Sequence, residues 1–150
     1  MNSAQLPMFV ESLCDAFKNM LGVELRAGEI QEASEPVKAD LSACVSVQGA
    51  SPALLVIGFD EQSAVEAAAR FVQMPCAFED PMVSDAAREI LNISVGGAQK
   101  RVTEKFSFSL PLSAQGINHE INSFRKGRIL GTKLSWGEKF SVSLFMNLPG

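Results

Sequence analysis

The stretch from Ser84 to Val102 constrains the fold more than any other part of this sequence. If successive residues are placed about 100° apart, as in an α-helix, most of its polar residues share about one third of the circumference. These residues form what we call the polar strip: Asp85, Arg88, Glu89, Asn92, Gly96, Gln99 and Lys100. The apolar residues occupy the rest: Ala86, Ala87, Ile90, Leu91, Ile93, Ala98 and Val102. We therefore expect a helix from about Ser84 to Thr103 that the rest of the chain covers on three sides, leaving the strip in water.

Two further helices are predicted by apolar residues that recur at steps of three and four. The first covers residues 6–21 and ends at Gly22, because glycine readily adopts the left-handed conformation that follows a helix. The second starts after Asp60, a residue type that caps helix N-termini, and ends before Pro75. The chain thus has an N-terminal helix and, later, a pair of helices.

Apolar and polar residues alternate in most of the remaining segments, which predicts strands on both sides of the helix pair. The predicted strands are 23–27, 41–47, 53–59, 106–112, 128–134 and 140–146. Pro111 is expected at a sheet edge or a bulge, since proline cannot donate a ladder hydrogen bond. This order indicates one α+β domain over residues 1–150, with an antiparallel or mixed sheet of about six strands and the helices packed on one face.

Composition excludes several classes of function. The 13 basic and 17 acidic residues give a net charge of −4 and form no basic cluster, which argues against a nucleic-acid partner. The three cysteines form no C-x-x-C pair and the chain has one histidine, so we expect no structural zinc site. The sequence has neither an export signal nor a stretch of about 20 apolar residues, so a cytoplasmic protein without a membrane span is expected.

The polar strip contains residues that weaken a helix. Asn92, Gly96 and Gly97 together cost about 2 kcal/mol relative to better helix formers. Gly97 points inward on the helical wheel, so we attribute it to close packing of a neighbouring element. Gly96 points outward, one turn beyond Asn92, and its bare backbone suggests a surface where a partner approaches closely.

Two side chains of the strip suggest a chemistry. The amide of Asn92 can orient a water molecule but has no pKa that would let it deprotonate one. Hydrolysis of an acyl or phosphoryl group that is already activated needs little more than such positioning. Glu89 adds an acceptor for a cation on a partner. The spacing by itself also fits an ordinary solvated helix face, and Asp85 also fits a carboxylate in the first turn of a helix.

The pattern Asp85-x3-Glu89-x2-Asn92-x3-Gly96, followed by the tripeptide 98–100, resembles the CheC/CheX/FliY family of chemotaxis phosphatases. Because the motif occurs once, the chain is most similar to the CheX type. The resemblance extends more loosely over most of the chain. It implies a CheC-like fold and an enzyme that hydrolyses the aspartyl phosphate of a CheY-like response regulator.

By the same resemblance, Asn92 would orient the attacking water, and Glu89 would pair with the phosphate-binding lysine of the regulator. Asp85 would be a lesser member of the motif, touching the partner together with Gly96. The chain would bind no metal or cofactor itself, because the regulator brings Mg²⁺, and it would form a homodimer. The alternative is a noncatalytic module that binds a response regulator or another signalling component through the same strip.

Other residues are expected to have structural roles. Arg88, Lys100 and Arg101 are interpreted as solvated charges. His119 is interpreted as a loop residue without chemistry, and Trp136 as packing at the end of a strand.

Overall fold

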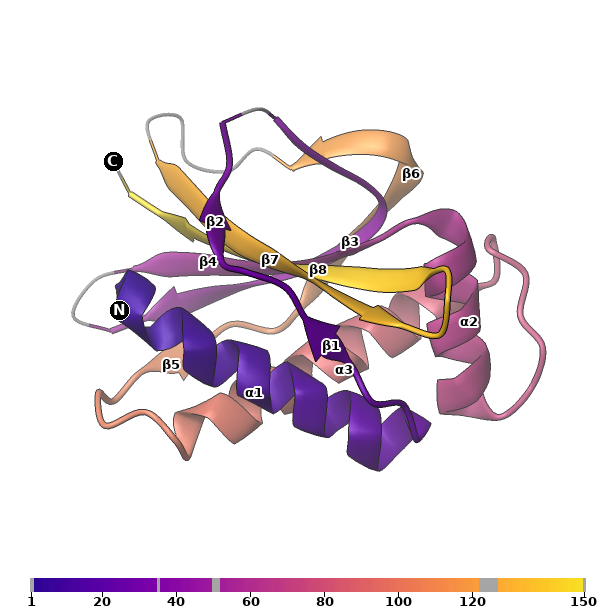
Figure 1. Cartoon of the computed structure of the whole chain (residues 1–150), viewed down its shortest axis with the longest axis horizontal. Coiled ribbons are helices and arrows are strands. Elements are labelled where there is room, and N and C mark those ends of the chain that lie inside the picture. Colours follow the sequence, from indigo (N-terminus) through magenta and orange to yellow (C-terminus); the bar gives the residue numbers. More distant parts are fainter. Residues whose placement is uncertain (1, 35, 50–51, 122–126, 150) are drawn as a thin grey trace.

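The computed structural model describes residues 2–34, 36–49, 52–121 and 127–149, which form an antiparallel sheet with three helices on one face (Figure 1). The helices are α1 (Leu6–Ala16), α2 (Glu61–Val72) and α3 (Pro81–Gln99), with a short 3₁₀ turn (Ser3–Gln5) before α1 and a π-helical turn (Phe17–Leu21) after it. The strands are β1 (Arg26–Ala27), β2 (Gln31–Glu32), β3 (Val37–Gln48), β4 (Ala53–Phe59), β5 (Ser107–Phe108), β6 (Leu112–Ile121), β7 (Arg128–Trp136) and β8 (Phe140–Leu148).

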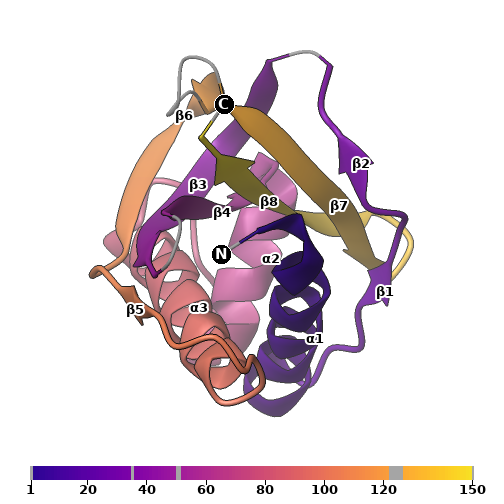
Figure 2. The ribbon, with the colours of Figure 1, turned by 90° about the vertical axis from the view of Figure 1, so that its left-hand side faces the viewer.

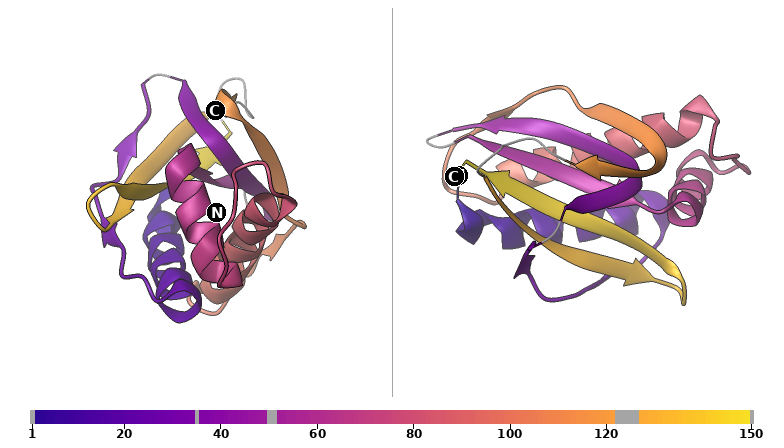
Figure 3. Two further views of the ribbon diagram at one scale, coloured as in Figure 1. Left: turned by 90° about the vertical axis from the view of Figure 1, so that its right-hand side faces the viewer. Right: turned by 90° about the horizontal axis from the view of Figure 1, so that it is seen from above.

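The described strands lie in the order β1-β7-β8-β4-β3-β5, with β2 also paired to β7 and β6 also paired to β3. All of these pairings are antiparallel, which decides between the two sheet types that the sequence left open. The sheet curves around the helices, so that β5 and β6 lie on the side of α3 and β1 on the side of α1 (Figure 2). The α+β architecture with its helices on one face is confirmed (Figure 3).

The segment around Pro111 departs from the prediction of one strand over 106–112. The chain pairs with β3 at Ser107 and Phe108, leaves the ladder, and pairs again from Leu112 onward. Proline has no N–H to donate, so the interruption falls where the sequence placed an edge or a bulge. The second part, β6, continues through His119, which therefore lies in a strand and not in a loop.

The helix α3 begins three residues earlier than predicted. Asp80 is the N-cap in an extended conformation and Pro81 occupies the first helical position, where the missing N–H of proline costs nothing. The helix packs against α1, α2, β3 and β6, as its wide apolar face requires.

One position on the helical wheel is wrong. Ile93 is 37% exposed, although the wheel places it inside. Ser94 is buried instead, and its Oγ donates to the carbonyl of Ile90 at 2.7 Å.

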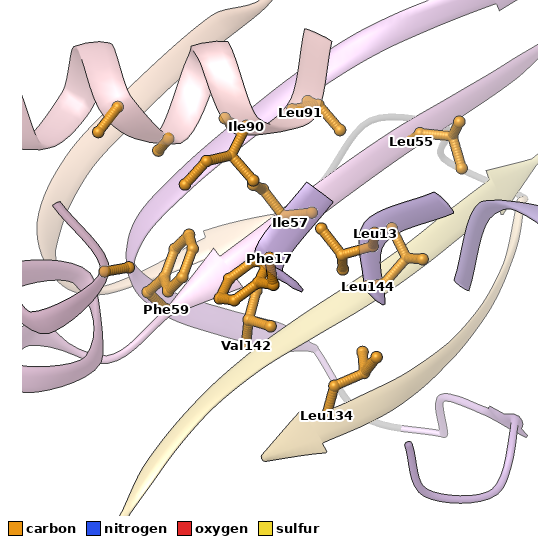
Figure 4. Close-up of a cluster of buried hydrophobic side chains, with 14 of the residues drawn as sticks. Leu13, Phe17, Leu55, Ile57, Phe59, Ile90, Leu91, Leu134, Val142 and Leu144 are labelled. Atoms are coloured by element: carbon orange, nitrogen blue, oxygen red, sulfur yellow. The ribbon is translucent and has the colours of Figure 1, made fainter. Parts of the chain in front are cut away.

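The core lies between the helices and the concave face of the sheet. Ile90 and Leu91 of α3 and Leu13 and Phe17 from the first helical segment point toward side chains of β4, β7 and β8 (Figure 4). Trp136 packs between two rings: its centroid lies 5.3 Å from that of Phe17, in a tilted arrangement, and 5.6 Å from that of Phe140, in a stacked one. Its predicted role in packing at the end of a strand is therefore confirmed.

Asp40, on β3, joins three elements at an irregularity of the β3–β6 ladder, where residues 116–118 of β6 lie opposite this one residue. One carboxylate oxygen of Asp40 accepts a hydrogen bond from the amide of Asn118 on β6 at 2.7 Å, and the other accepts from the amide of Glu61 at 2.8 Å. Asp60 caps the same helix by accepting from the amide of Ser63 at 2.8 Å. The start of α2 is thus fixed to the sheet by charge-assisted hydrogen bonds. No helix in the described ranges is long and apolar enough to cross a membrane.

Gly131 on β7 provides a test of packing on the outer face of the sheet. A Cβ atom at this position would lie 2.8 Å from the carbonyl oxygen of Leu144 and still closer to the ring of Phe145. We expect Gly131→Ala to lower the free energy of unfolding by about 2 kcal/mol, because overpacking of this kind forces neighbours to move. Urea denaturation measures the change. Gly116→Ala is the control, since a Cβ there meets nothing within 4 Å; equal losses in the two variants would contradict the prediction.

Candidate functional site

The polar strip of α3 faces a shallow hollow of about 430 Å³. Glu89 and Asn92 line its floor, and Leu110 and Pro111 form the opposite wall. Glu89 is exposed and Asn92 is half-buried. The structure therefore brings the two predicted site residues together beside a segment that follows them by about twenty positions in the sequence.

The amide of Asn92 is available to a ligand. Its side chain makes no hydrogen bond to another described residue. Within the described ranges, Trp136 Nε1 is the only side-chain nitrogen or oxygen atom that is both buried and without a partner, so the amide of Asn92 retains contact with solvent. A half-buried amide that keeps its donors and acceptor free can hold a water molecule or a polar group of another protein.

The carboxylate of Glu89 is also available to a ligand. It forms no ion pair with a described residue, although Arg88 is the neighbour of Glu89 in the sequence. Glu89 and Asn92 are three residues apart and therefore lie side by side on the helix. A free carboxylate beside a free amide can bind a cation and a water molecule at neighbouring points.

The prediction that Arg88 is a solvated charge is wrong. Its guanidinium donates to the carboxylate of Asp85 and to the Oγ of Ser113 on β6, and its side chain is 34% exposed. Asp85 in turn does not lie in the first turn, because α3 already begins at Pro81. Its carboxylate is held by Arg88, although its side chain is 63% exposed.

The other two basic residues of this region behave differently from each other. Arg101 donates to the carboxylate of Asp15 and, at 3.2 Å, to the Oγ of Ser12, so it ties the end of α3 to α1 and is not a free charge. Lys100 is exposed, as expected.

The two glycines of α3 have different surroundings. A Cβ at Gly96 would meet nothing within 4 Å, so the helix surface beyond Asn92 is bare, as predicted. Gly97 faces α1, also as predicted, but a Cβ there would lie 3.6 Å from the Oγ of Ser12, an ordinary contact. The prediction that close packing requires a glycine at position 97 is therefore wrong.

The sequence pattern does not predict the wall of the hollow. Leu110 is 84% exposed, and Leu112 beside it is 69% exposed. The alternation of residues 106–112 predicts both leucines on the apolar side of a strand. The signal that could have revealed them is Pro111, since an apolar residue next to a predicted sheet edge need not face the core.

Neither the thiols of Cys14 and Cys44 nor a cluster of metal-ligating side chains indicates another chemistry within the described ranges. Burial raises the pKa of the Cys14 thiol, as do the nearby carboxylates of Asp15 and Glu11, and burial also raises the pKa of the Cys44 thiol. Both thiols therefore stay protonated and poorly nucleophilic near neutral pH. No group of three or more His, Cys, Asp or Glu side chains within the described ranges could hold a metal ion.

His119 holds two strands together. Its Nδ1 lies 2.7 Å from the carbonyl oxygen of Gly116, which can only accept, so Nδ1 carries the proton. In the neutral ring with this tautomer, Nε2, which lies 2.8 Å from the Oγ of Ser42, accepts from that hydroxyl. The ring thus joins β6 to β3.

Comparison with known proteins identifies the family. The model of the family described as chemotaxis phosphatase CheX matches residues 41–130, more than half of the chain. The chain belongs to the CheX family. A search among curated proteins finds no match.

Solved structures of the CheX and CheC-like type share the fold. A CheC-like superfamily protein from Shewanella sp. PV-4 is 24% identical, with a TM-score of 0.86 over 100% of both chains. CheX from Vibrio vulnificus is 23% identical, with a TM-score of 0.87 over 97% of this chain and 99% of that one. A chain of the CheX–CheY–BeF3–Mg²⁺ complex from Borrelia burgdorferi is 18% identical, with a TM-score of 0.80 over 97% of each chain. The predicted CheC-like fold is confirmed.

The free amide of Asn92 leads to a prediction about stability. We expect Asn92→Ala to leave the free energy of unfolding unchanged or to raise it by up to about 0.7 kcal/mol, because no hydrogen bond is lost and alanine is the better helix former. Ile90→Ala, two positions earlier in the core, should cost about 2–5 kcal/mol. Urea denaturation of both variants checks this. A loss above about 1 kcal/mol for Asn92→Ala would mean that the amide serves the fold.

Proposed function

We propose that this protein hydrolyses the aspartyl phosphate of a CheY-like response regulator, with Asn92 orienting the attacking water and Glu89 docking on the regulator. Membership of the CheX family supports the reaction class. The observation that carries the proposal is the half-buried amide of Asn92, which lines a hollow and has no hydrogen-bond partner among the described residues. A relative of the same fold from Borrelia burgdorferi forms a complex with CheY, BeF3 and Mg²⁺.

In the proposed reaction, a water molecule attacks phosphorus as the bond from phosphorus to the aspartyl oxygen breaks. The products are inorganic phosphate and the free carboxylate of the regulator, and the proton of the water passes to a phosphate oxygen. Little nucleophilic assistance is needed in a loose transition state, so an amide that fixes the position of the water is sufficient and a strong base is unnecessary. The Mg²⁺ ion of the regulator would neutralise charge on the phosphoryl oxygens.

Glu89 would dock by accepting a charge-assisted hydrogen bond from the phosphate-binding lysine of the regulator. The pairing would place Asn92, one turn further along, over the phosphoryl group. Gly96 would let the surface of the regulator approach the helix, since a side chain is missing at the next turn. Docking and water positioning would thus come from one face of one rigid helix.

The resemblance to CheX-type proteins adds two parts to the proposal. The protein would act as a homodimer, which a sizing measurement on the purified chain tests. It would act in the cytoplasm, on a regulator that brings its own Mg²⁺, so the chain itself would need no metal or cofactor.

We predict separate kinetic effects for the two site residues. Asn92→Ala should lower kcat for phosphate release from a phosphorylated regulator by about 10²-fold or more, while binding is kept, because the water loses its fixed position. Glu89→Ala should also weaken binding of the regulator. Asn19→Ala, an exposed asparagine on another helical segment, is the matched control and should match the wild type.

The measurement is the rate of phosphate release from the regulators of the host, each phosphorylated with a small phosphodonor. If the wild type binds a regulator through Glu89 but does not accelerate release from it, the noncatalytic binding module is the correct reading.

The two neighbouring glycines allow a matched pair of variants. Gly96→Ala and Gly97→Ala should each raise the free energy of unfolding by up to about 1 kcal/mol, since alanine replaces glycine inside a helix. Only Gly96→Ala should lower the affinity for the regulator, because its Cβ points into open space beside Asn92. Urea denaturation and titration with the regulator in the presence of BeF3 and Mg²⁺ measure the two effects. Equal affinities would remove Gly96 from the contact surface.

A further inference from the structure

We infer that Arg88 is a positioning residue of this site and that Asp85 acts through Arg88, without touching the regulator. The inference rests on the proposed function. Arg88 joins two walls of the hollow: it belongs to α3, and its guanidinium donates to Ser113 on β6. Ser113 follows Leu110 and Pro111, which form the opposite wall, by only two or three residues.

That wall has few polar contacts with α3. None of the residues of β6 is fully buried, and among the described strands β6 pairs only with β3. Its ladder begins at Leu112, which lies opposite Cys44, so Leu110 and Pro111 stand just outside it. The ladder with β3 holds the backbone of β6, and Ser109, just before Leu110, exchanges two hydrogen bonds with Ser46 of β3. Because apolar burial contributes little here, polar contacts between α3 and β6 are what join the two walls directly.

Two such contacts exist. Arg88 bonds to Ser113, and one turn earlier the Oγ of Ser84 donates to the Oε1 of Gln115 at 3.1 Å. Gln115 also donates to the carbonyl of Phe78, at 2.8 Å. The Ser84 contact lies away from the hollow, whereas Arg88 is one of its lining residues. Arg88 is therefore the side chain that links β6 to α3 at the hollow itself, beside Asn92.

Asp85 determines which groups the guanidinium of Arg88 can contact. An exposed ion pair of residues three apart on a helix contributes little to stability by itself. Here, however, the guanidinium that donates to Asp85 also donates to Ser113, and it forms no ion pair with the neighbouring Glu89. A guanidinium released from Asp85 could bind Glu89 and compete with the lysine that Glu89 is proposed to accept. Asp85 thus keeps Glu89 free.

The first experiment measures hydrogen exchange in the free protein. In Arg88→Ala and in Ser113→Ala, the backbone amides of residues 112–114 should exchange at least about tenfold faster, because the segment loses its attachment to α3. The amides of β4 should not change. Arg70→Ala is the matched control, since it removes an ion pair with Glu66 that lies within α2 and includes no residue of β6. Unchanged exchange at 112–114 in both variants would overturn the inference.

The second experiment measures turnover of the phosphorylated regulator. Arg88→Ala, Asp85→Ala and Ser113→Ala should each raise KM about tenfold and change kcat by less than about threefold, since docking is affected more than the water held by Asn92. The double variant Asp85→Ala/Arg88→Ala should be no worse than Arg88→Ala alone, because Asp85 acts only through Arg88. If the two effects add, Asp85 touches the regulator itself and the inference is wrong.

The outcomes separate this inference from the proposed function. If the wild type releases no phosphate, the proposed function fails, and the exchange rates together with affinities for the regulator still decide the role of Arg88. If the wild type is active and Arg88→Ala is indistinguishable from Arg70→Ala in both experiments, the proposed function stands and the inference fails.

Discussion

The burial of α3 on several sides is the interaction on which the rest of this structure depends. The helix contacts α1, α2 and the strands β3 and β6. The sheet to which these strands belong curves around the three helices (Figure 2). Since most of its apolar face is covered, the polar strip and Ile93 are the main parts of the helix that reach water. The packing that buries the apolar face of α3 therefore determines which side of the helix another molecule can meet.

This packing also gives the site its rigidity. Asn92 follows directly after Ile90 and Leu91, two of the most deeply buried residues of the core (Figure 4). Arg101, at the far end, ties the helix to Asp15 of α1. Catalysis by positioning requires an amide whose backbone cannot shift, because a small displacement of the water lowers the rate steeply. A side chain on a helix that is anchored in this way meets the requirement better than one on a loop.

The second wall of the hollow is held differently. The β6 strand has no fully buried residue and is held in the sheet by its ladder with β3, and side-chain hydrogen bonds such as that from Arg88 to Ser113 join it to α3. Exposed leucines at positions 110 and 112 leave an apolar surface next to a charged one. The candidate site thus combines a floor on a helix that is anchored in the core with a wall of exposed apolar side chains.

The sequence by itself determined the parts of this protein that depend on local periodicity: three helices, most strands, the outward-facing Glu89 and Asn92, and the bare surface at Gly96. Only the tertiary structure decided the antiparallel order of the strands, the break of the ladder before β6, and the partners of Arg88. The physical reason is the separation along the sequence of the residues that interact. A helical wheel reports which side of one element is apolar, whereas Arg88 and Ser113 are 25 residues apart and meet only because β3 pairs with β6.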